Sequence, residues 1–160
     1  MKEKTCCFLG HRKIDISDFL KIKLYEAIKK LIIENNIDIF LFGNKSQFND
    51  VCYDIVSELR KIYPHIKRVY VRAKFPYISE DYKSYLLERY EETYFPSNAL
   101  NAGRASYIKR NANMIDNSTY CIIYFDENYT PNTKNISGSG TKTAYNYAVK
   151  KEKKIINMFR

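Results

Sequence analysis

The stretch that indicates the fold of this chain is Thr5-Cys6-Cys7-Phe8-Leu9-Gly10-His11-Arg12. A short apolar run that ends at a glycine and leads into a helix pattern predicts a buried β-strand followed by a turn. Such a turn leaves free backbone N–H groups at the start of the helix, where the partial positive charge suits a phosphate. We therefore expect an α/β domain whose first turn contacts a phosphorylated ligand.

The same order of elements recurs along the chain. Gly43 follows the apolar residues 39–42, and Gly138 and Gly140 stand in the loop after the apolar residues 121–125. Glycine lets a backbone approach a ligand closely because it has no Cβ. Its repeated placement after strands points to a nucleotide or another phosphorylated ligand.

Strands and helices alternate through most of the sequence. Periodic apolar residues predict helices at residues 17–34, from Asn49 or Asp50 to Pro64, at residues 104–116 and around residues 144–148. Apolar runs predict further strands at residues 37–42, 67–71, 120–125 and 155–159, of which 67–71 is the most polar and is expected near an edge. Residues 72–103 break this rhythm and are expected to form an insertion or lid with a helical stretch at residues 80–93.

This alternation predicts an α/β fold of the Rossmann-like kind. We expect a mainly parallel sheet of about five strands with helices on both faces, in one domain over residues 1–160. Ligands of such sheets bind outside the carboxyl ends of the strands, at the topological switch point. Gly10, Gly43, Asp126 and the glycines at residues 138–140 should converge there.

Net charge, apolar run length and cysteine spacing indicate which partners and which cellular compartment to expect. The formal net charge of +9 makes phosphate-bearing partners plausible, with nucleic acid as the weaker alternative to a small molecule. No apolar run approaches ~20 residues and no leader is recognised, so we expect a cytoplasmic protein that does not enter a membrane. The cysteines lack C-x-x-C spacing, and we expect buried free thiols and no metal site; they are Cys6, Cys7, Cys52 and Cys121.

The turn Gly10-His11-Arg12 is a candidate ligand contact. The Arg12 guanidinium can donate two parallel hydrogen bonds to phosphate oxygens, and His11 can donate a hydrogen bond to a phosphate or ribose. The alternative is a turn whose basic side chains face water.

The loop Ser137-Gly138-Ser139-Gly140-Thr141 before the last helix is the stronger candidate. Its glycines permit close approach, its hydroxyls add donors, and the helix N-terminus supplies a favourable field. It matches neither the P-loop nor the G-x-G-x-x-G pattern. The alternative is a flexible loop that ends in a threonine N-cap.

Three motifs carry a resemblance to a known family. They are Cys7-Phe8-Leu9-Gly10-His11-Arg12, then Arg110-Asn111-x-x-Met114-Ile115-Asp116, and Ser137-Gly138-Ser139-Gly140-Thr141 with Tyr147-Ala148. In this order they resemble the YpsA-like branch of the SLOG superfamily, the Rossmann-like group that also holds the Lonely-guy phosphoribohydrolases and the DNA-binding DprA proteins. The resemblance covers nearly the whole chain apart from residues 72–103. It implies a pocket for a nucleotide or nucleotide-derived ligand of the ADP-ribose or NAD type.

The chain departs from the Lonely-guy enzymes at their catalytic pair. Arg110 matches the arginine of their R-K-x-x-M segment, but Ala144 stands where their P-G-G-x-G-T-x-x-E motif has its glutamate, and Ser137 replaces the proline. Cleavage of an N-glycosidic bond needs a carboxylate for the oxocarbenium-like transition state or an acid for the leaving base. The departure counts against the same mechanism.

The second loop departs as well. Relatives carry a glycine-rich stretch after the second strand, whereas this chain has Gly43 and Asn44 and then Phe48 in place of the second glycine. Asp50 aligns with the family's aspartate. It could hold a ribose hydroxyl or cap the helix, and the sequence favours neither.

We expect a binding module, a sensor or accessory protein for a nucleotide-derived ligand, which needs no cofactor. One alternative is a nucleotide N-glycosidase or phosphoribohydrolase-like enzyme, with a carboxylate from Asp50, Asp126 or the pair Glu91-Glu92. The other alternative is a DprA-like nucleic-acid binder, which is favoured by the net charge of +9 and by the fifteen tyrosines. The sequence leaves open whether the chain forms a homo-oligomer.

Overall fold

The computed structural model describes residues 2–43, 45–128 and 140–159. Its centre is a sheet of six parallel strands in the order β4-β3-β2-β1-β5-β6. The strands are β1 (Thr5–Gly10), β2 (Ile39–Phe42), β3 (Lys67–Val71), β4 (Glu92–Tyr94), β5 (Tyr120–Tyr124) and β6 (Lys154–Asn157). The expected Rossmann-like α/β fold is confirmed, with one strand more than expected.

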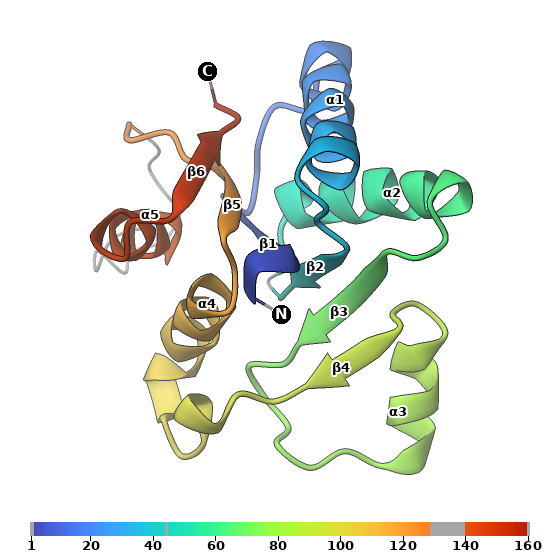
Figure 1. Ribbon diagram of the computed structural model, residues 1–160. Helices are drawn as coiled ribbons and strands as arrows, with labels where there is room; N and C mark the ends of the chain where they lie inside the picture. Colours follow the sequence, from blue (N-terminus) through green and yellow to red (C-terminus); the bar gives the residue numbers. More distant parts are fainter. Residues whose placement is uncertain (1, 44, 129–139, 160) are drawn as a thin grey trace.

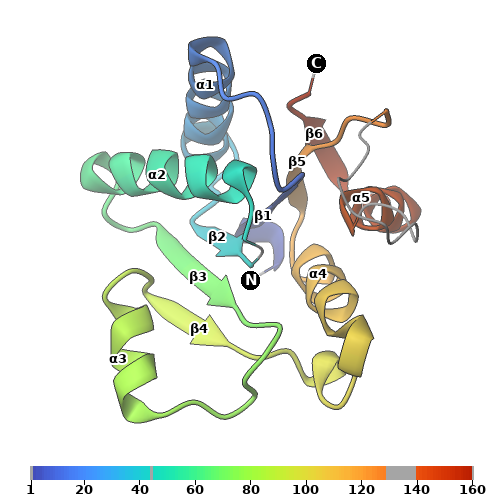
Figure 2. The ribbon, with the colours of Figure 1, turned by 180° about the vertical axis from the view of Figure 1, so that it is seen from behind.

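Helices cover both faces of the sheet. They are α1 (Asp18–Glu34), α2 (Gln47–Ile62), α3 (Glu80–Leu87), α4 (Ser106–Asp116) and α5 (Gly140–Lys150), with short 3-10 turns η1 (Lys2–Lys4), η2 (Ser97–Ala99) and η3 (Gly103–Ala105). Figures 1 and 2 show α1 and α2 on one face and α4 and α5 on the other, with α3 beside β4. The chain fills the sheet outward from β1 to β4 and then crosses to the other side of β1, so the switch point lies between β1 and β5.

The extra strand lies in the segment that was expected to be an insertion. The expected helical stretch at residues 80–93 is wrong at its end, because α3 stops at Leu87 and β4 pairs with β3 from Glu92 onward. Strand β3 is therefore next to the edge, and β4 is the edge. Arg68 fixes this pairing, since its guanidinium and backbone N–H both donate to the Glu91 carboxylate, at 2.7–3.1 Å.

The two long N-terminal helices begin at serine caps. The Ser17 hydroxyl accepts from the Leu20 N–H and starts α1 where the sequence predicted it. In α2 the cap is Ser46, whose hydroxyl accepts from the Asn49 N–H at 3.0 Å. The prediction that Asn49 or Asp50 opens this helix is wrong, because the serine three residues earlier supplies the oxygen.

The core has one half on each face of the sheet. Phe8, Phe40 and Phe42 pack with α1 and α2 on one face, and Cys7, Leu9 and Cys121 pack with α4 and α5 on the other. All four cysteines are buried free thiols, as expected.

No group of metal-ligating side chains is found among the residues described. None of the described helices combines the length and the apolar content needed to span a bilayer.

Candidate functional site

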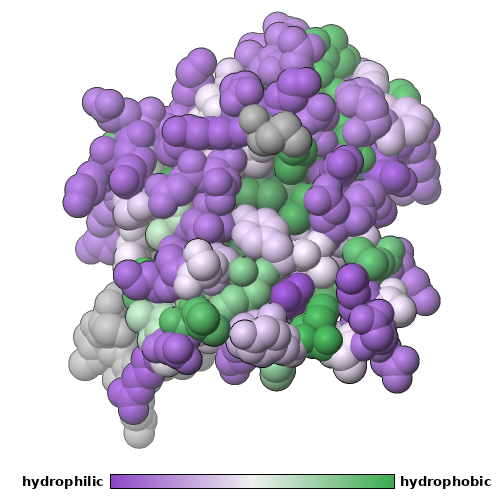
Figure 3. All heavy atoms as spheres, turned by 60° about the horizontal axis from the view of Figure 1, so that its bottom comes forward, coloured by the Kyte–Doolittle hydropathy of each residue, from purple (hydrophilic) through white to green (hydrophobic). Residues whose placement is uncertain are grey.

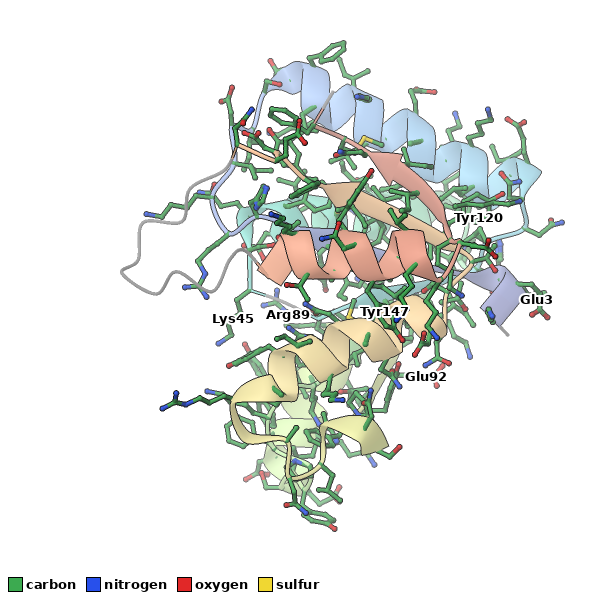
Figure 4. The ribbon with its side chains drawn as sticks, turned by 90° about the vertical axis from the view of Figure 1, so that its left-hand side faces the viewer. Glu3, Lys45, Arg89, Glu92, Tyr120 and Tyr147 are labelled. Atoms are coloured by element: carbon green, nitrogen blue, oxygen red, sulfur yellow. The ribbon has the colours of Figure 1, made fainter. Side chains whose placement is uncertain are left out.

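The carboxyl edge of the sheet brings several predicted site residues to one side of the molecule. Gly10 ends β1, Gly43 follows β2, and Asp126 lies two residues after β5. Figure 4 shows Lys45, just past β2, on this side, and Glu3 and Tyr120 at the amino ends of β1 and β5 on the opposite side. The predicted residues Asn44, Ser137, Gly138 and Ser139 lie outside the described residues.

The absence of a Cβ at Gly10 makes room for the side chain of Phe48. A Cβ placed on Gly10 would come within 2.4 Å of Cδ2 and 2.6 Å of Cβ of Phe48, far inside van der Waals contact. Phe48 is fully buried, and its ring lies 5.7 Å from that of Tyr124. Phe48 occupies the space on the Cβ side of Gly10, and the contact of a phosphate with the Gly10 backbone stays a prediction.

His11 links the ends of β1 and β5. The side chain is buried, and its Nε2 accepts a hydrogen bond of 2.9 Å from the Asp126 backbone N–H. Burial lowers the pKa of His11, while the hydrogen bond and the Asp126 charge oppose the shift. The imidazole is therefore neutral near pH 7 and uses Nε2 as an acceptor, so this nitrogen does not donate to a ligand.

The switch point between β1 and β5 is consequently lined by packed side chains. The rings of Tyr124 and Phe125 lie 6.4 and 5.9 Å from that of His11, and the Phe48 ring lies 5.7 Å from that of Tyr124. Arg12 is exposed beside this cluster.

The N-terminus of α2 is covered by the loop that follows β1. The Gln47 backbone N–H donates to the Arg12 carbonyl at 2.8 Å, and Gln47 Oε1 accepts from the Ile14 N–H at 2.9 Å. Asp50 lies mostly exposed in the first turn. Partial loss of solvent around its carboxylate and the nearby Asp54 raise its pKa, while Arg89 opposes the shift. Asp50 does not cap the helix, because Ser46 does.

The carboxyl ends of β2 and β3 hold a buried cation, Arg110. Its side chain comes from α4 and is 2% exposed. Nη1 donates to the carbonyl oxygens of Gly43 and, at 3.4 Å, Val71, and Nε donates to the Asn111 amide oxygen at 2.9 Å. A Cβ on Gly43 would come within 2.8 Å of the Arg110 Cδ, so the glycine makes room for this side chain.

Arg110 has no negatively charged partner among the residues that the structure describes. Within the described residues no carboxylate oxygen lies within 4 Å of its guanidinium, and burial lowers its pKa to about 10. The arginine at the start of β3 differs, because Arg68 pairs with Glu91 at 2.7 Å. A buried guanidinium is costly unless hydrogen bonds satisfy its donors and an anion compensates its charge.

Sequence reasoning missed a second buried arginine, Arg72, which directly follows β3. It is 8% exposed, and burial lowers its pKa. Its Nε donates to the Phe75 carbonyl at 3.2 Å and its Nη1 to the Thr93 hydroxyl at 3.0 Å. No carboxylate in the described ranges lies within 4 Å of it. An arginine at the carboxyl end of a predicted strand is the signal that could have identified it.

The start of α5 adjoins a small, mostly apolar hollow on the α4 side. This hollow of about 40 Å³ is lined by Ile108, Asn111, Ala112, Ile115, Gly140, Thr143, Ala144 and Tyr147. Tyr147 points from α5 toward α4 (Figure 4), and its hydroxyl lies 2.9 Å from the Asp116 carboxylate. Thr141 is buried beside Gly140, and a Cβ on Gly140 would meet nothing within 4 Å.

No protein-family model matches this chain, and no curated protein is significantly similar to it.

Proposed function

We propose that this protein binds a nucleotide or nucleotide-derived ligand, with a phosphate of the ligand beside Arg110 at the carboxyl ends of β2 and β3. The observation that carries the proposal is a fully buried guanidinium with backbone carbonyls and an amide as partners and no carboxylate among the described residues. A phosphate would supply the missing negative charge and accept charge-assisted hydrogen bonds. The resemblance to the SLOG superfamily supports the same position, since Arg110 matches the arginine of that motif.

Binding without hydrolysis is the favoured activity. Glu91 is engaged by Arg68 and Arg60, at 2.7 and 3.3 Å, and Glu92 by Lys67 at 3.2 Å. Ala144, at the position of the Lonely-guy glutamate, is packed into the core beside α4. Because both carboxylates are held in these ion pairs, neither Glu91 nor Glu92 is placed to assist a leaving base. This supports a sensor or accessory role over a glycosidase.

A thermal-shift screen followed by calorimetry tests the proposal. NAD, ADP-ribose, cyclic nucleotides and nucleoside monophosphates are the ligands, and Arg110→Gln is the variant. A ligand at a hundred times its Kd stabilises the native state by about 2.7 kcal/mol, which raises the Tm of a chain of this length by roughly 5–10 °C. We expect such a rise in the parent protein and its loss in Arg110→Gln.

Lys109→Gln is the matched control, because it removes a positive charge from the exposed neighbour on the same helix. We expect this variant to keep the ligand-induced rise. An equal loss in both variants would contradict a specific site at Arg110 and favour general attraction to the net charge of +9.

Chromatography of the same mixtures tests for hydrolysis. We expect no released base. Base release that disappears in Asp50→Asn or Asp126→Asn would replace the binding role with the glycosidase alternative.

A further inference from the structure

We propose that the loop after β3, together with Tyr82 of α3 and Tyr107 of α4, forms a stacking site for the base of the bound nucleotide. This inference rests on the proposed function and adds the part of the ligand that Arg110 does not contact. The residues concerned are Lys74, Phe75, Tyr82 and Tyr107, and we call them the aromatic lip.

The aromatic lip is continuous with Arg110. The centre of the Tyr107 ring lies 5.5 Å from Cζ of Arg110 and 5.6 Å from Nζ of Lys74, so this ring connects Arg110 with the loop after β3. Lys74 precedes Phe75, whose ring meets that of Tyr82 edge-on at 6.2 Å. A ligand with its phosphate at Arg110 would therefore have the Tyr107 ring beside it, and the loop that carries Lys74 and Phe75 next to that ring.

Phe75 is held in a conformation that its side chain does not favour. Its φ angle is 62°, in the left-handed region, and its side chain is 60% exposed. Buried Arg72 holds this backbone by donating to the Phe75 carbonyl, and it is anchored in turn by Thr93. Strain at an exposed aromatic residue needs a compensating benefit, and such residues cluster at ligand sites.

The surroundings suit a flat, electron-rich ligand group. Figure 3 shows the side of the molecule that carries this loop, where hydrophobic side chains lie in patches among hydrophilic ones. In the part of the chain that the structure describes, no carboxylate lies within 4 Å of the side-chain nitrogens of Lys74, Arg72 or Arg110. Aromatic faces and unpaired cations together favour a nucleobase joined to a phosphate.

The test compares AMP with ribose 5-phosphate by calorimetry, because the second ligand lacks the base and keeps the phosphate. We expect the parent protein to bind AMP about tenfold more tightly than ribose 5-phosphate, the order of one stacked base. Phe75→Asn removes the ring and keeps a residue that tolerates the left-handed region. We expect it to abolish the tenfold preference without changing the affinity for ribose 5-phosphate or lowering the Tm.

Tyr77→Ala is the matched control, because it removes an aromatic ring that is 88% exposed two residues away. We expect it to keep the preference for AMP. Equal affinity of the parent protein for the two ligands, or an AMP affinity unchanged in Phe75→Asn, would overturn the aromatic lip and leave the phosphate site standing. Failure of both ligands to bind would overturn the proposed function and the lip with it.

A 5′-phosphorylated oligodeoxyadenylate distinguishes a free nucleotide from the end of a strand. We expect AMP to displace it. Binding of the strand that AMP cannot displace would overturn the assignment to a nucleotide and indicate a nucleic-acid surface.

Discussion

Phe48 packs against Gly10 so closely that a Cβ added to Gly10 would come within 2.4 Å of the Phe48 ring. The two residues join β1 to the first turn of α2, and the contact fills the crevice that ligands occupy in many parallel sheets. Among the residues that the structure describes, Arg110 and Arg72 have no carboxylate within 4 Å, and they lie instead at the ends of β2 and β3. The ligand position that we propose is therefore on the side of the segment that contributes α3 and β4.

The first prediction follows from this contact. Gly10→Ala should destabilise the protein by about 1–3 kcal/mol, because the added methyl overpacks a buried site. Combining it with Phe48→Leu should cost less than the sum of the two single changes, since both act on one contact. Gly140→Ala is the control: it meets no atom within 4 Å and begins α5, so stability should stay equal or rise by up to about 1 kcal/mol. Urea unfolding measures all four variants, and additive costs would contradict the direct contact.

The second prediction concerns the ion pairs that attach β4. Glu91→Gln should cost about 1.5–3 kcal/mol, because the Arg68 guanidinium and N–H lose a charged acceptor. Glu92→Gln should cost less than about 1 kcal/mol, since its pair with Lys67 is more than half exposed. Similar losses for the two variants would contradict the special role of Glu91.

The ion pair of Arg68 with Glu91 also predicts that the stability of the protein depends on pH. Burial raises the pKa of Glu91, but hydrogen bonds and charge from Arg68 and Arg60 outweigh it, so the pKa is lowered from 4.5. A carboxyl whose pKa is lower in the folded state stabilises the protein above the unfolded value and loses that stabilisation as the pH falls. The difference in stability between the parent protein and Glu91→Gln should therefore begin to shrink as the pH falls below about 4.5 and should vanish once the pH is below the folded pKa.

The sequence predicted the alternation of elements well, because apolar periodicity and glycine position are local signals. It missed β4, a strand of three residues whose place depends on the pairing of Arg68 with Glu91 across 23 positions. It could not show that Phe48 covers Gly10, since that contact exists only once α2 packs on β1. The motif around Arg110 marked a residue that proves to be buried at the carboxyl edge, whereas Arg72 lies outside any motif.

His11 predicts a second pH dependence, with a different range. Its pKa is lowered from 6.5 by burial, so the unfolded chain takes up a proton more readily than the native protein. Native stability should therefore be full above about pH 6.5 and fall as the pH drops through the folded pKa. His11→Gln keeps an acceptor for the Asp126 N–H and removes the titration, so its stability should vary less between pH 7.5 and about pH 5. The exposed His65→Gln is the control and should lose stability as the parent does; a loss in His11→Gln as steep as in the parent, or a shallower loss in His65→Gln, would contradict the assignment to His11.

The last prediction asks whether Gly43 contacts the ligand or acts through Arg110. A Cβ at this position would lie 2.8 Å from Arg110 Cδ and 2.7 Å from Met114 Sδ. Both are side-chain atoms that can move, so Gly43→Ala should fold and should displace the guanidinium from its place at the strand ends. We expect the ligand-induced rise in Tm to shrink as it does in Arg110→Gln.

The double variant separates the two roles of Gly43. If the glycine serves only to seat Arg110, Gly43→Ala should weaken binding no further once Arg110→Gln is present, because the group that it positions is already gone. Calorimetric titration of the parent, both single variants and the double variant with AMP measures this coupling. A double variant weaker by the sum of the single effects would show instead that the backbone at Gly43 contacts the ligand independently.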